Sequence, residues 1–123
     1  PFGDVFCRQT TEKVPLDRSL CFDVSSIPST DAQLRAATQL ACWSYGQSVS
    51  ECAKILAEEK DENGIPLDPE RHHFMVMDEL WQILEAWDGS VHRINAITRV
   101  NRTEGLGQIM ITHSMKDLEL STA

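Results

Sequence analysis

The sequence lacks several features that would assign it to a common class of protein. No apolar run approaches the ~18–20 residues needed to span a membrane, and the opening residues do not form a signal peptide. The four cysteines contain no CxxC pair, which argues against a zinc site and favours free thiols in a reducing cytosol. Basic residues are scarce: 11 Lys and Arg accompany 19 Asp and Glu, so the net charge of −8 repels nucleic acid.

The length of 123 residues corresponds to one domain that can bury a core. The hydrophobic share of 41% and the charged share of 24% are those of an ordinary globular chain. The chain opens on Pro1 rather than on a methionine, so we expect it to be a piece of a longer protein. Residues 1–19 are predicted to form an irregular lead-in, and residues 20–123 a folded core.

The most informative stretch is an apolar run that ends in two carboxylates. Phe74–Met77 is uninterrupted by polar residues, which predicts a strand buried on both faces of a parallel sheet. Asp78 and Glu79 follow at the carboxyl end of this strand, the position at which open α/β sheets bind ligands. The simpler alternative is a helix cap or a partner of the helix dipole, because acidic residues are favoured in the first turn of any helix. The helix expected next places one apolar face at Leu80, Ile83, Leu84 and Trp87.

Two further apolar runs predict two more strands. They are Leu20–Val24 and Gln108–His113, and helical patterns separate the three runs. Such alternation is typical of the α/β class, with a parallel sheet of about three strands flanked by helices.

The helices have recognisable boundaries. Residues 31–59 are rich in helix formers, with Thr30 as the expected N-cap and an apolar stripe at Leu34, Ala37 and Ala41. Gly46 is a weak point where this helix is expected to bend or split. A second helix is expected over residues 91–104, followed by Gly105 in the position that glycine favours after a helix.

These elements, taken in order, resemble the conjugative type IV secretion ATPases. Phe22-Asp23-Val24-Ser25 is similar to that family's Phe-Asp-Leu-Ser strand, and Asp78-Glu79-Leu80-Trp81 to its Asp-Glu-Ala-Trp Walker B segment. Residues 99–107 and 109–114 are similar to its arginine-bearing helix, Gly-rich turn and sensor strand. The resemblance spans roughly residues 20–120. It implies that residues 1–123 are a fragment of one RecA-like ATPase domain, a three-layer P-loop NTPase fold. The sheet order of that family implies Phe74–Met77 in the centre, with Cys21–Val24 and Ile109–Thr112 on either side.

The resemblance also implies chemical roles. Asp78 would hold Mg²⁺ directly or through water, and Glu79 would polarise the attacking water. Thr112 and His113 would lie at the tip of the sensor strand, against ATP. Arg99 and Arg102 would act as arginine fingers for a neighbouring subunit, their alternative being a solvated helix face. Trp81 and Trp87 are interpreted as packing aromatics.

The sequence departs from the family in ways that affect activity. It contains no GxxxxGK[ST] loop, so the chain alone is expected to be inactive, with ATP and Mg²⁺ bound only in the complete protein. His113 replaces the usual glutamine. A neutral imidazole could still hydrogen-bond phosphate or water, but its charge would vary with pH.

The functional expectation is part of an ATP-hydrolysing motor of a conjugation or type IV secretion apparatus. Such a motor would form a homo-oligomeric ring, contact secretion-channel subunits, and meet DNA only indirectly. It would be cytoplasmic and held at the inner membrane face by its partners. The Ile109–Thr112 strand would form an open edge, so we expect this fragment to dimerise or residues 1–19 to cover that edge. The alternative is a non-catalytic α/β interaction module that docks to secretion or DNA-transfer subunits.

Overall fold

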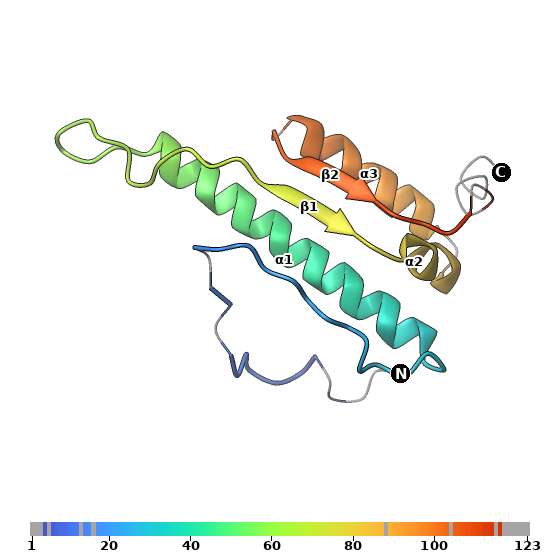
Figure 1. Ribbon diagram of the computed structural model, residues 1–123. Helices are drawn as coiled ribbons and strands as arrows, with labels where there is room; N and C mark the ends of the chain where they lie inside the picture. The colour runs from blue at the N-terminus through green and yellow to red at the C-terminus, as the bar shows by residue number, and fades with distance from the viewer. Residues whose placement is uncertain are drawn as a thin grey trace.

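The computed structural model describes residues 4, 6–12, 14–15, 17–87, 89–103, 105–114 and 116, without the side chains of residues 97 and 100–103. Its elements are the helices α1 (Ala32–Glu58), α2 (Leu80–Ala86) and α3 (Ser90–Thr103), and the strands β1 (Phe74–Met77) and β2 (Gly107–Met110) (Figure 1). The described chain is therefore mixed helix and strand, compatible with the predicted α/β class.

The two strands form a parallel pair. Phe74 lies opposite Gly107, and Met77 opposite Met110. This arrangement confirms the predicted strand at Phe74–Met77 and its parallel pairing with the strand that follows. β2 starts one residue earlier than predicted and ends earlier, although the N–H of Ile111 still donates to the carbonyl of Met77 at 2.9 Å.

The predicted strand at Leu20–Val24 is wrong. Leu20 and Phe22 are 42% and 43% exposed, and no strand is assigned to this segment. Asp23 instead accepts a hydrogen bond from the backbone N–H of Ser25 at 2.8 Å, a local bond with which Asp favours turns over sheet ladders. Among the described residues the sheet therefore has two strands, and β1 is not flanked on both sides.

α1 matches its predicted bounds but not its predicted details. Asp31, rather than Thr30, is the N-cap, and its Oδ1 accepts from the N–H of Leu34 at 3.0 Å. The helix continues through Gly46 without a break. A Cβ at that position would lie 2.9 Å from Cε of Met75, so the glycine leaves room for the end of that side chain.

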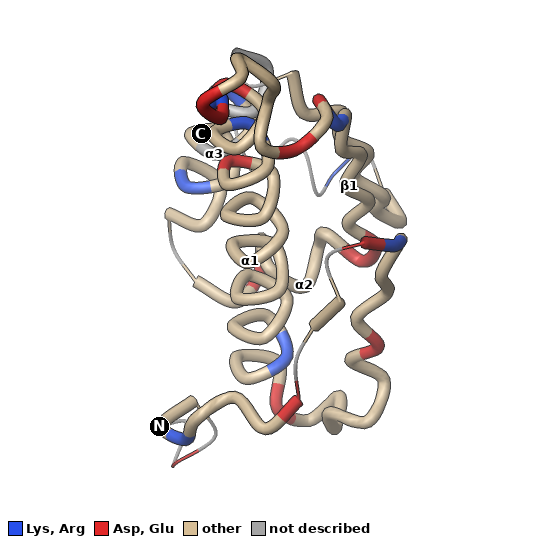
Figure 2. The backbone as a smooth tube through the Cα atoms, turned by 90° about the vertical axis from the view of Figure 1, so that its left-hand side faces the viewer, with Lys and Arg blue, Asp and Glu red and all other residues tan. Residues whose placement is uncertain are grey.

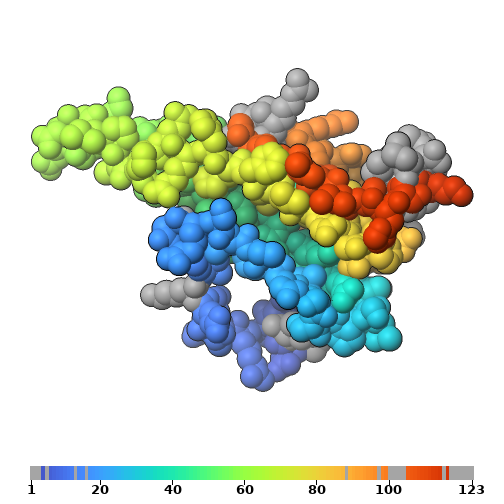
Figure 3. Space-filling model, in the orientation of Figure 1, coloured from blue at the N-terminus to red at the C-terminus, as the bar shows by residue number. Residues whose placement is uncertain are grey.

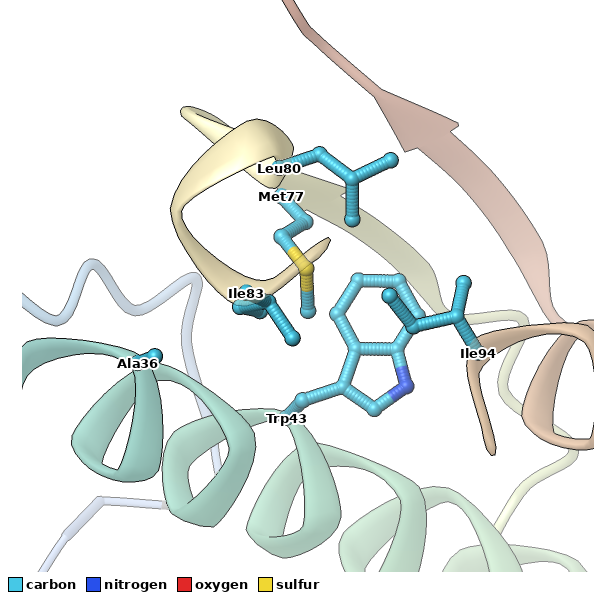
Figure 4. Packing of buried hydrophobic residues seen from close by; sticks show 6 residues of the cluster. All are labelled: Ala36, Trp43, Met77, Leu80, Ile83 and Ile94. Carbon is cyan, nitrogen blue, oxygen red and sulfur yellow. The ribbon is translucent and has the colours of Figure 1, made fainter. Parts of the chain in front are cut away.

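The hydrophobic core lies between the helices and one face of the sheet. Its central side chain is Trp43, which points from α1 toward Met77 and Ile94 (Figure 4). Leu80 and Ile83 of α2 complete the buried cluster together with Ala36. The buried seam of α1 therefore runs along Ala36 and Trp43 instead of the predicted stripe, of which Ala41 is exposed.

The other face of the sheet is uncovered and apolar. Phe74 and Val76 are 63% and 58% exposed, and Ile109 and Ile111 lie beside them on β2 and just after it. These four residues are here called the open sheet face; the strands reach the surface in the view of Figure 3. The prediction that Phe74–Met77 is buried on both faces is therefore wrong, because the described helices pack on only one side (Figure 2).

All four cysteines are free thiols. Cys42 is half-buried in α1, and desolvation raises the pKa of its thiol above the ordinary value of 9.0. Cys52, in the same helix, is exposed. No helix within the described ranges is long and apolar enough to cross a membrane.

Candidate functional site

The candidate site lies where both strands end. Because β1 and β2 are parallel, the carboxylates after β1 and the polar residues after β2 meet at the same edge of the sheet. Nε2 of His113 lies 2.8 Å from Oε2 of Glu79. The structure thus brings together two of the residues that the sequence singled out, from segments far apart in the chain.

A third side chain, Trp81, joins this pair. Its indole N–H donates a hydrogen bond to Oε2 of Glu79, the same oxygen that faces His113. Its ring also contacts the imidazole of His113, with ring centroids 5.9 Å apart and planes inclined by 40°. Sequence reasoning interpreted Trp81 only as a packing residue. No local signal identifies its role, because its partner ring arrives from the loop after β2.

The backbone at Glu79 is unusual. Its φ of 56° and ψ of 41° place it in the left-handed region, which costs a residue with a side chain roughly 1–2 kcal/mol. Within the described turn, the Glu79 side chain makes no capping hydrogen bond to α2. Glu79 therefore occupies the N-cap position of α2 without capping the helix through its side chain. Such strained positions are concentrated at functional sites.

Hydrogen bonds of the main chain hold this turn against the end of β2. The N–H of Leu80 donates to the carbonyl of Ile111 at 2.9 Å, just beyond the bond between Ile111 and Met77. Leu80 itself is 3% exposed and belongs to the core. The position of Glu79 is therefore set by the packing of its neighbour and by the sheet.

Asp78 has a more local environment. It is exposed, and its Oδ1 accepts the N–H of Glu79 at 2.9 Å. The described residues contain no group of three or more His, Cys, Asp or Glu side chains that could hold a metal ion. Mg²⁺, however, commonly takes only one or two protein carboxylates, with waters and phosphate oxygens as its other ligands. The exposed carboxylate of Asp78 could therefore serve as one ligand of Mg²⁺, with waters or phosphate oxygens as the others.

Of the two predicted arginines, Arg99 lies away from the site in the described part of the chain. Arg99 is exposed near the C-terminal end of α3, which leads into the start of β2 and so lies at the opposite end of the sheet from His113 (Figure 1). Arg102 belongs to α3, but its side chain lies outside the described residues. Thr112 is half-buried directly before His113, at the same edge as Glu79.

The arrangement at this edge can therefore hold a carboxylate beside an imidazole, next to an exposed second carboxylate. Charged residues elsewhere are scattered over several elements (Figure 2). Comparisons of this chain with protein-family models, with curated proteins and with solved structures found no match.

Proposed function

We propose that this chain supplies the Walker B acid pair and the sensor strand of an ATP-hydrolysing motor in a conjugation or type IV secretion apparatus. The observation that carries the proposal is the contact between Glu79 and His113 at the carboxyl edge of the parallel sheet. Open α/β sheets bind ligands at this edge. The left-handed backbone of Glu79 supports the same interpretation, because it costs free energy at an N-cap whose side chain makes no capping hydrogen bond.

Each residue then has a distinct role. Glu79 polarises the attacking water, and Asp78 holds Mg²⁺ directly or through a water. His113, with Thr112 beside it, faces the terminal phosphate of ATP. Bound Mg²⁺ would neutralise charge on the phosphate oxygens. The RecA-like fold is part of this proposal, and the phosphate-binding loop would come from sequence outside these 123 residues.

The arginines suggest that the motor is oligomeric. Arg99 is exposed and lies away from Glu79 in its own chain, so it could only serve the nucleotide of a neighbouring subunit. Arg102 is proposed for the same role. A homo-oligomeric ring, docked to secretion-channel subunits at the cytoplasmic side of the membrane, would provide that neighbour. DNA would be contacted only indirectly, given the net charge of −8.

A second candidate function is a non-catalytic interaction module. The open sheet face favours it, because contiguous exposed apolar side chains often mark protein-binding surfaces. This module would dock to secretion or DNA-transfer subunits and would not use Glu79 chemically.

One experiment separates the two functions. In the complete protein, Glu79→Gln should keep ATP affinity but slow steady-state phosphate release by about 10²–10⁴-fold, the usual loss when a general base is removed. Asp78→Asn should instead weaken Mg²⁺-dependent nucleotide binding. Glu85→Gln, an exposed carboxylate on α2, is the matched control and should behave as the parent does. Parental turnover by Glu79→Gln would refute the motor and leave the interaction module.

A further inference from the structure

The two oxygens of the Glu79 carboxylate are not equivalent. Oε2 faces both the indole N–H of Trp81 and Nε2 of His113. Two protein groups therefore engage the same oxygen of the carboxylate, and Oε1 takes part in neither of these contacts.

We propose that Trp81 is a positioning residue that holds Oε2 of Glu79, so that Oε1 is aimed at the attacking water. This inference deepens the motor function proposed above and rests on it for the role of the water. Trp81, Glu79 and His113 are here called the carboxylate clamp.

The clamp restricts the rotamers of the Glu79 side chain. The Glu79 side chain is 36% exposed, so without partners it would populate several rotamers. Trp81 donates from the first turn of α2, and His113 approaches from the loop after β2. The contact between their rings restrains the indole in turn. Two donors from separate elements thus fix one carboxylate in one orientation.

The two donors have different constraints. His113 is 70% exposed and, in the proposed motor, must also reach the phosphate of ATP. Its Nε2 cannot donate its proton to Glu79 and to phosphate at the same time. The indole N–H of Trp81 is a donor at every pH and has no second role in the proposal. Trp81 would therefore retain the carboxylate when His113 leaves it.

The test of the clamp is spectroscopic and uses this chain. In ¹H–¹⁵N spectra, the indole signal of Trp81 is assigned by its disappearance in Trp81→Phe. Glu79→Ala should move that signal upfield and speed its exchange with solvent by about tenfold, the effect of losing a hydrogen bond to a charged acceptor. Glu85→Ala on the same helix is the matched control and should leave the signal in place. An unchanged Trp81 signal in Glu79→Ala, with the backbone spectrum still folded, would overturn the proposal.

A kinetic arm uses the complete protein. Trp81→Phe should lower kcat by about tenfold at unchanged ATP affinity, while Trp81→His, which retains an N–H donor, should recover part of the loss. If Glu79→Gln is inactive but Trp81→Phe turns over as the parent does, the clamp is refuted and the motor stands. If Glu79→Gln is active, the motor fails. The indole spectrum then decides by itself whether Trp81 holds the carboxylate.

Discussion

Replacing Glu79 by glycine tests whether this residue serves function or stability. Glycine reaches φ 56° without the steric cost that a side chain meets, so the substitution should gain about 1 kcal/mol. It removes the hydrogen bond from Trp81 to a charged, partly exposed acceptor, worth about 1.5 kcal/mol. It also removes the contact with His113. That contact joins side chains that are 36% and 70% exposed, so solvent screening leaves it nearly no net contribution.

These contributions nearly cancel. We expect the free energy of unfolding of Glu79→Gly to stay within about 1 kcal/mol of the parent. Glu79→Ala keeps the left-handed strain and loses the same contacts, so it should be less stable than Glu79→Gly by about 1 kcal/mol. The neighbouring Leu80→Ala removes a side chain that is 3% exposed and should cost about 2–5 kcal/mol.

Urea unfolding followed by circular dichroism measures these differences in the 123-residue chain. Phosphate release by the complete protein gives the functional comparison, in which Glu79→Gly should be inactive. A loss of more than about 2 kcal/mol in Glu79→Gly, comparable to that of Leu80→Ala, would show that Glu79 is a structural residue. The strain argument would then be refuted.

Two further predictions concern other parts of the chain. Burial raises the pKa of Cys42, so at pH 8 Ellman's reagent should modify this thiol more slowly than the three exposed cysteines. Equal modification rates would contradict this prediction. The stability that comes from burying the neutral thiol is present below pH 9.0 and is lost as the pH rises through the higher pKa of the folded state. We expect the 123-residue chain to self-associate through the open sheet face, with an apparent mass in light scattering that rises with concentration. The double substitution Val76→Lys with Ile109→Lys should abolish this association, whereas Ile65→Lys, in an exposed connector, should not. A parent that is monomeric at every concentration would refute this association.

The sequence by itself determined the local elements. The bounds of α1, the strand at Phe74–Met77 and the glycine after α3 were all predictable, and Gly105 does adopt a left-handed φ of 69°. Helix propensity, apolar runs and the special conformations of glycine act over a few residues, so short windows of sequence contain them. For the same reason the carboxylates Asp78 and Glu79 could be placed at a strand end.

Only the tertiary structure decided what those elements meet. Leu20–Val24 has the composition of a buried strand, but a strand is buried only where other elements pack against it. In the structure Leu20 and Phe22 are exposed, and Asp23 accepts a local hydrogen bond from Ser25. The open sheet face arises in the same way, from helices that pack on one side of β1 and β2. The clamp depends on Trp81 and His113 reaching one oxygen of Glu79 from separate elements. Contacts between distant segments depend on how whole elements pack, which no single stretch of sequence specifies.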